Sequence, residues 1–468
     1  MIQPVNSPFQ IEKVGLRPAM KTSLLSCVLA LLASACDVES TSSNTGGVDD
    51  SDAATENDTS AETTGDAAAA VEVDAGDRDA GESPPTPVCN DGMTVVMSDY
   101  VSTQVALTDL KGATKSASFV SSASTQTQGL AFALSGDVVL PSSAPASGRI
   151  VLLDRFGTNV VSWFDPKTSE ALGQLAVGTG FESNPQDYVE VDEKVAFISR
   201  WGQNAAPGQE DFDAGDDVLV VDTRKFSILD SIAMPEKGGL PPRPGDLIRM
   251  GDEIVVMLKP LSNDYATTGE AWLVGISIEE WEITWQLHLE GLKDCGGFAL
   301  SPDRKTLALA CTGGIDFNGV VEDLGQSAVV LLDATTSPPE ELERVQADDI
   351  VGEPLQPDAE FATNDQLLLK TQTAYGGGTN NRWLLLDLES KDTESLLEAQ
   401  PDGEGLGKGI VYGGMSCAPG CSDMCVMADA DSGRLQRLEF DEDGAFELLE
   451  AITVEDEVGL PPRTLVQR

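Results

Sequence analysis

From about residue 88 to its carboxyl end, the chain alternates short apolar runs, rich in β-branched residues, with turns containing Gly, Pro, Asp or Asn. Apolar runs bounded by such turns are typical of β-strands. Their close and regular spacing predicts an all-β domain that covers residues 88–468.

One kind of apolar run recurs seven times, ending near Asp109, Asp165, Asp222, Gly275, Asp333, Asp387 and Asp441. The steps between these positions are 56, 57, 53, 58, 54 and 54 residues. A near-constant step is typical of a closed repeat array rather than a sandwich or an α/β fold.

Each period contains four predicted strands. In the third period these are "PQDYVEV", "KVAFISR", "DVLVVD" and "SILDSIAM". Four antiparallel strands per unit, repeated seven times, predict a seven-bladed β-propeller. The period is longer than that of WD-type blades, and the WD dipeptide and Gly-His signature of those blades are missing from the sequence.

The end of the chain repeats a phrase from its middle. Residues 459–468 read "GLPPRTLVQR", and residues 239–250 read "GLPPRPGDLIRM". The internal copy leads into the innermost strand of the fourth blade, whereas the first blade, which starts at "MTVVMSDY", has no strand before its second one. We therefore expect the terminal copy to supply the missing inner strand and to close the ring, because an open ring would expose two unpaired edges.

Two phrases, "VLVVDTRKFSILDSIAM" and "VSWFDPKTSEALGQLAV", resemble the YVTN-type propellers found on prokaryotic surfaces. Both consist of an apolar strand, an Asp, a turn and a second strand. The resemblance extends over roughly residues 90–468, although a blade such as "AWLVGISIEEWEI" has no Asp at that place. It implies the same propeller fold.

The amino-terminal 35 residues predict a signal peptide, with Met20 as a plausible true start. "MKTSLLSCVLALLASAC" has a lysine, an apolar stretch too short to span a membrane, and small residues before Cys36. "LASAC" resembles a bacterial lipobox, with Ala33 where Leu is preferred, and the resemblance implies cleavage after Ala35 and lipid attachment at Cys36. Ordinary secretory cleavage is the alternative. Either reading predicts an extracytoplasmic protein, and the lipoprotein reading, which is the stronger, predicts one that is lipid-anchored in the bacterial cell envelope.

Residues 36–87 are rich in Ser, Thr, Ala, Asp and Glu and contain almost no large apolar side chain. Such a segment cannot bury a core, so we expect a disordered acidic linker that holds the folded domain away from the membrane. The whole chain has 29 basic and 78 acidic residues and a formal net charge of −49. This charge argues against nucleic acid and anionic membrane surfaces as partners.

Six cysteines follow Cys36, an even number that suggests disulfides in an oxidising compartment. In "CGGFALSPDRKTLALAC" a turn at Asp303 places Cys295 opposite Cys311 in an antiparallel pair, which predicts a disulfide. Cys89 and the triplet Cys417, Cys421 and Cys425 meet at one end of the ring. We expect Cys89 to bond one member of the triplet and the other two to pair, with a thiolate metal site as the alternative.

The loops between the second and third strands are long, and they leave the blades at the same end as the links between blades. Loops on a rigid scaffold are where binding residues concentrate. We therefore expect the binding face at this end, where Arg200 and Arg243 should point near the central mouth. The candidate residues of this face are Arg200, Trp201, Phe212, Arg243, Tyr265, Phe317 and Tyr375.

Catalytic signals are weak in this sequence. Its one histidine, His288, falls on a predicted outer strand, far from the mouth, and the GxSxG, HExxH and P-loop motifs are missing. "DFDAGDD" has oxygen ligands at alternating positions that would suit Ca²⁺, although it does not match the EF-hand spacing. The possible calcium ligands are Asp211, Asp213, Asp216 and Asp217.

Two functions from different classes remain open at this stage. The first, which the sequence favours, is a monomeric, lipid-anchored and non-catalytic propeller that binds an envelope protein or glycan and touches the membrane only through its anchor. The second is an exported propeller enzyme, lactonase-like, lyase-like or quinoprotein-like, with a carboxylate-bound metal at the central mouth. No cofactor other than Ca²⁺ is indicated.

Overall fold

A computed structural model describes residues 92–467 except 112, 125–129, 315–320, 322, 372–381, 399–412, 419–422, 431, 442–443 and 455–458. The chain divides into two compact units, Met1–Arg78 and Asp79–Arg468, and every described residue belongs to the second. The expected signal peptide, Cys36 and the linker therefore lie outside the described residues and stay predictions.

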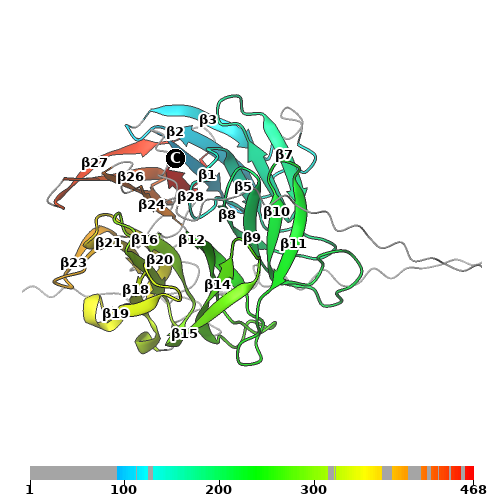
Figure 1. Ribbon diagram of the computed structural model, residues 1–468. Helices are drawn as coiled ribbons and strands as arrows, with labels where there is room; N and C mark the ends of the chain where they lie inside the picture. The colour runs from blue at the N-terminus through cyan, green and yellow to red at the C-terminus, as the bar shows by residue number, and fades with distance from the viewer. Residues whose placement is uncertain are drawn as a thin grey trace, which may run out of the picture. The chain divides into compact units, whose positions relative to one another are not determined.

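Within the described residues the chain forms seven four-stranded antiparallel sheets, arranged as the blades of a ring (Figure 1). This confirms the seven-bladed propeller. From the inner to the outer strand, the first four blades are β28 (Pro462–Gln467), β1 (Met93–Ser98), β2 (Thr103–Thr108), β3 (Thr114–Ser121); β4 (Val138–Val139), β5 (Ile150–Asp154), β6 (Val160–Phe164), β7 (Ala171–Ala176); β8 (Pro185–Glu190), β9 (Val195–Gln203), β10 (Gly215–Asp222), β11 (Ser227–Ala233); β12 (Pro244–Met250), β13 (Glu253–Leu258), β14 (Glu270–Ser277), β15 (Ile283–Lys293).

The last three blades follow the same order. They are β16 (Cys295–Leu300), β17 (Thr306–Cys311), β18 (Ala328–Asp333), β19 (Glu340–Gln346); β20 (Leu355–Phe361), β21 (Gln366–Thr371), β22 (Arg382–Asp387), β23 (Thr393–Glu398); β24 (Met415–Cys417), β25 (Met424–Asp429), β26 (Arg434–Phe440), β27 (Phe446–Thr453). Two short helical segments, η1 (Leu324–Gln326) and α2 (Ala347–Ile350), lie in the fifth blade and in the link that follows it. No helix in the described part of the chain has the length and apolar character needed to cross a membrane.

The strand order gives the ring two different ends. Because neighbouring strands are antiparallel, the second strand of each blade ends where the link from the preceding blade enters the inner strand. We call this the loop end, because the long connections 204–214 and 259–269 lie there. The other end, the turn end, carries the short turns between first and second strands, such as residues 301–305.

The carboxyl-terminal strand closes the ring. β28 pairs with β1 in antiparallel register, with Leu465 opposite Val95 and Gln467 opposite Met93, and the two strands lie side by side in Figure 1. The two copies of "GLPPR" also act alike: Arg243 and Arg463 each bond a backbone carbonyl and lie over an aromatic ring at the loop end. The repeated phrase is thus the entrance to an inner strand in both places.

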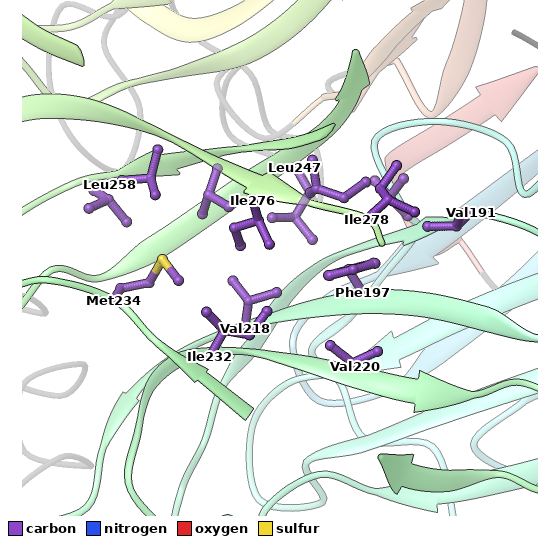
Figure 2. Close-up of a cluster of buried hydrophobic side chains, with 14 residues drawn as sticks. Val191, Phe197, Val218, Val220, Ile232, Met234, Leu247, Leu258, Ile276 and Ile278 are labelled. Atoms are coloured by element: carbon purple, nitrogen blue, oxygen red, sulfur yellow. The ribbon is translucent and has the colours of Figure 1, made fainter. Parts of the chain in front are cut away.

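The hydrophobic core is divided among the gaps between blades. Seven clusters of buried side chains occur among the described residues, and each joins two neighbouring blades. Figure 2 shows the cluster between the third and fourth blades, where Phe197, Val218 and Val220 face Leu247 and Ile276. Burial of apolar area on this scale, at about 25 cal/mol per Å², is the main force that holds blade to blade.

The second and third strands of the blades are mostly buried on both faces, which explains their continuous apolar runs. In β10, Val218 and Val220 face the fourth blade, whereas Leu219 and Val221 face the second. Side chains alternate between the two faces of a strand. A strand between two neighbouring blades therefore needs apolar residues at every position.

Two disulfides are present within the described residues, Cys295–Cys311 and Cys417–Cys425. Each joins directly opposite residues of a first and a second strand. The first confirms the pairing expected from the turn at Asp303, and the second joins two members of the triplet. The expected bond between Cys89 and the third member, Cys421, lies outside the described residues.

Candidate functional site

Arg200 is placed differently from the expectation that it points near the central mouth. It lies at the end of β9 with no exposed side-chain surface, and its guanidinium makes two bonds to Asp217 of 2.7 and 2.5 Å. It also donates to the carbonyls of Val177 and Phe212. Arg200 therefore joins the second and third blades instead of offering a charge to a ligand.

Arg243 has a similar anchoring role at the base of the loop end. Its side chain is buried, donates to the carbonyl of Trp201 at 2.9 Å and to Asn263 at 2.5 Å, and lies 3.7 Å from Asp216. Tyr265, in the loop between β13 and β14, is 66% exposed. Of the expected face, Tyr265 is thus open to a partner, Trp201 and Phe212 are half-buried, and Phe317 and Tyr375 lie outside the described residues.

Three of the four aspartates considered for Ca²⁺ are drawn into separate contacts. Asp213 accepts hydrogen bonds from the backbone N–H groups of Gly208, Gln209 and Glu210, which hold its pKa below the usual value. Asp217 pairs with Arg200, and burial raises the pKa of Asp216 to about 6 although Arg243 partly offsets it. Asp211 is exposed on the loop. Among the described residues, no group of three or more His, Cys, Asp or Glu side chains is arranged to hold a metal ion.

A cavity lined by many charged side chains lies on the axis of the ring. Its volume is about 340 Å³, and its lining includes residues of all seven inner strands and charged side chains that come from inner strands and from the ends of second strands. This volume is within the range of small-ligand sites. The charged lining residues are Arg155, Asp187, Asp246, Asp358, Glu360, Lys370 and Arg463.

Three of these carboxylates occupy the same register position in different blades. Asp187, Asp246 and Asp358 each precede the residue that resumes pairing with the second strand after an irregular step in the ladder. Such steps re-aim side chains and often lie next to functional sites. The sequence analysis missed this set, although the phrases "PQDY", "PGDL" and "QPDA" at equivalent places in the period carry the signal.

Two lysines neutralise part of the acidic lining. Lys259 lies 3.1 Å from Asp246, and burial, which lowers its pKa, is outweighed by the attraction of Asp246, Asp294 and Asp358, so that the pKa is raised. Lys370 lies 2.5 Å from Asp358 and donates to the carbonyl of Gly413 at 2.7 Å. Both lysines come from the loop-end halves or ends of second strands, which places these two ion pairs near the loop end.

Other carboxyl groups in or beside the cavity have no cation at hydrogen-bond distance within the part of the chain that the structure describes. Burial and the charge of Asp246 raise the pKa of Asp187 to about 6, although Ser142 and the backbone of Leu247 donate to it. Burial also raises the pKa of Asp294, and Lys259 offsets only part of the effect. Burial and the neighbouring Asp358 raise the pKa of Glu360 well above its usual value. Ionisation of these carboxyl groups is unfavourable, because the nearby positive charges do not fully replace the hydration that burial removes.

His288 lies where the sequence predicts, on the outermost strand of the fourth blade. Its ring stacks on Trp272, with centroids 4.3 Å apart, and its Nε2 lies 2.5 Å from a carboxylate oxygen of Glu270. These partners place it on the outer wall, away from the axial cavity.

Comparison with known proteins supports the fold. No family model and no curated protein sequence matches the chain. The chain is similar in structure to a candidate 6-phosphogluconolactonase of Bacteroides uniformis, with a TM-score of 0.50 and 13% identity over 80% of this chain and 99% of that one. A Lactobacillus plantarum protein gives a TM-score of 0.50, 10% identity and coverage of 80% and 98%. Identities this low show a shared seven-bladed propeller fold and no more.

Proposed function

We propose that this protein is a lipid-anchored, extracytoplasmic binding module that receives an envelope protein or glycan at the loop end of its propeller. The observation that carries the proposal is the axial cavity, whose Asp246 and Asp358 are held by Lys259 and Lys370 near that end. These two ion pairs are held in place by the packed residues around them, so they form a rigid set of hydrogen-bond donors and acceptors. Such an array suits recognition, because little ordering is required when a ligand arrives.

The loop end adds adaptable surface around the cavity. Tyr265 is largely exposed beside Asn263, whose amide oxygen accepts a bond from Arg243. A rigid base below an exposed aromatic is common in binding loops, since the aromatic offers a large contact area at low entropic cost.

A second candidate is an exported enzyme of the lactonase-like, lyase-like or quinoprotein-like kind. The raised pKa of Glu360, which lies in the cavity near Lys370, favours it, because a carboxyl group that keeps its proton to a higher pH than usual can donate that proton to a bound substrate. The carboxylate-bound metal of the earlier expectation finds no suitable three-residue group within the described residues.

The test is capture of partners from native envelope extracts by the full-length protein. We expect the double variant Tyr265→Ala and Asp246→Asn to lose a partner that the wild type retains. The matched control is Leu342→Ala with Asp303→Asn, which alters an exposed apolar residue on an outer strand and an aspartate at the turn end. Equal capture by all three proteins would contradict the proposal, and turnover of lactones by the wild type but not by Glu360→Gln would favour the enzyme.

A further inference from the structure

The charges of the axial cavity do not balance. The cavity and its immediate neighbours hold four cationic groups, which are Arg155, Lys259, Lys370 and Arg463. They also hold six carboxyl groups, which are Asp137, Asp187, Asp246, Asp294, Asp358 and Glu360. With every group ionised, two negative charges remain in excess around the axis of the ring.

The cations present are already engaged by acidic groups or backbone carbonyls. Arg155 pairs with Asp137 at 2.6 Å, and Arg463 donates to the carbonyl of Ser98 at 2.8 Å. Lys259 is attracted by three carboxylates, and Lys370 lies between Asp358, the carbonyl of Gly413 and the ring of Trp383. An anionic ligand would therefore have to displace existing ion pairs.

Close packing of the cavity wall also keeps the acidic side chains from moving away from the axis. A Cβ on Gly296 would lie 2.6 Å from Asp246 and 2.8 Å from the ammonium of Lys259. A Cβ on Gly297, whose φ is +66°, would lie 2.3 Å from the Cα of Asp358. Two consecutive glycines thus let β20 and the Lys259–Asp246 pair press against β16, which fixes the acidic groups at the axis.

We propose that this cavity binds a cationic group, an alkylammonium or guanidinium such as the end of a lysine or arginine side chain or of a polyamine. The inference rests on the binding function proposed above and names the chemistry of its ligand. The ligand cation would lie among Asp187, Asp246 and Glu360, where it supplies the positive charge that the wall lacks. A low-dielectric cavity strengthens such an attraction relative to the exposed surface.

Binding should also move protons. Asp187 is faced by Asp246, Ser142 and the backbone of Leu247, Glu360 by Asp358, Lys370 and the backbone of Cys417, and Asp294 by Lys259 and Asp246. A bound cation favours the ionised form of these carboxyl groups and lowers their pKa. A proton that Asp187 holds in the free protein at pH 6 is then released on binding, and affinity rises as the pH increases through about 6.

The experiment is calorimetry with the full-length protein at about 0.15 M salt, which screens binding to the acidic surface. The probes are n-butylammonium, 1,4-diaminobutane and a blocked pentapeptide with one central lysine, with the Nε-acetylated peptide as the uncharged match. We expect the charged probes to bind, the acetylated peptide not to bind, and protons to be released on binding at pH 6. Tighter binding of the peptide points to a basic side chain of a protein partner, and tighter binding of the diamine points to a free polyamine.

Single substitutions distinguish binding in the cavity from binding elsewhere on this acidic protein. Asp246→Asn and Glu360→Gln should each weaken binding by about tenfold, the change expected for loss of one close charge pair. Asp303→Asn removes the same charge at the turn end and should leave affinity unchanged. Equal weakening in all three variants, or binding without proton release in the wild type, would overturn the proposal. Partner capture that depends on the loop end, without amine binding, would leave the binding function standing and reject only this ligand.

Discussion

Leu465 lies directly opposite Val95 in the first blade, although 370 residues separate them in the chain. Its side chain packs in the cluster that joins the seventh and first blades, and that of the next residue, Val466, packs between the first and second blades. One strand from the end of the chain therefore contributes to both interfaces of the blade that contains the first strand. Ring closure depends on it.

Leu465→Ala should lower the free energy of unfolding by about 2–4 kcal/mol, because it removes buried apolar volume and leaves a cavity at the seam. Urea denaturation followed by tryptophan fluorescence measures the change. Leu342→Ala is the matched control, since Leu342 is 58% exposed and its truncation should change stability by less than about 0.5 kcal/mol. Similar effects of the two variants would contradict the role of β28 in closure.

Asp217→Asn should destabilise the protein by about 3–5 kcal/mol, because it leaves the fully buried Arg200 guanidinium without its counter-charge. The same substitution at Asp137, whose pair with Arg155 is a quarter exposed, should cost less than about 1 kcal/mol. Thermal unfolding of both variants checks the difference. If Asp217→Asn proved as mild as Asp137→Asn, Arg200 would have to be free to move toward solvent.

Replacing Cys295 and Cys311 together by Ser should lower stability by about 3 kcal/mol, and replacing Cys417 and Cys425 by about 2.5 kcal/mol. The difference follows from the sequence separations of 16 and 8 residues, since the longer loop removes more entropy from the unfolded chain. Unfolding under oxidising conditions gives the two values. Under reducing conditions wild type and variants should converge, and a persistent difference would mean that serine itself disturbs the strands.

Asp187 should make the protein less stable as pH rises from about 4 to 6. Its pKa is about 6 in the folded protein and lower when unfolded, so the folded state binds the extra proton and its stability falls until Asp187 is ionised. The loss amounts to about 3 kcal/mol for a shift of roughly two pKa units. Asp187→Asn should be destabilised throughout, because its amide meets the N–H of Leu247, but the difference between variant and wild type should shrink as pH rises. A difference that stays constant across this range would show that Asp187 does not titrate there.

Much of the fold could be predicted because its signals are local and repeated. The seven apolar runs, the four strands of a period and the facing cysteines Cys295 and Cys311 each follow from spacing along a few tens of residues. Even the seam was predictable, since "GLPPR" labels the entrance to an inner strand wherever it occurs. The long separation between Val95 and Leu465 did not hide their contact, because the repeat supplied the missing register.

The candidate site was predicted less well. The binding face at the loop end stays a prediction, whereas Arg200 and Arg243 hold loops and blades together, and Asp213, Asp216 and Asp217 of "DFDAGDD" have partners of their own. Long loops with charged residues look alike in sequence whether their charges face a ligand or a neighbouring strand. Burial distinguishes the two cases, and the spacing of residues along the sequence does not show which side chains are buried.

By itself, the sequence determined the number of blades, the strands in each blade and the strand that closes the ring, because a repeating pattern of apolar residues admits few ways to pair them. Only the tertiary structure decided that Asp187, Asp246, Asp358 and Glu360 meet two lysines at the axis. These residues come from three different blades, and their side chains face one another only after the ring has closed. Ring closure therefore decides which of these carboxylates pair with a lysine and which have no cation beside them.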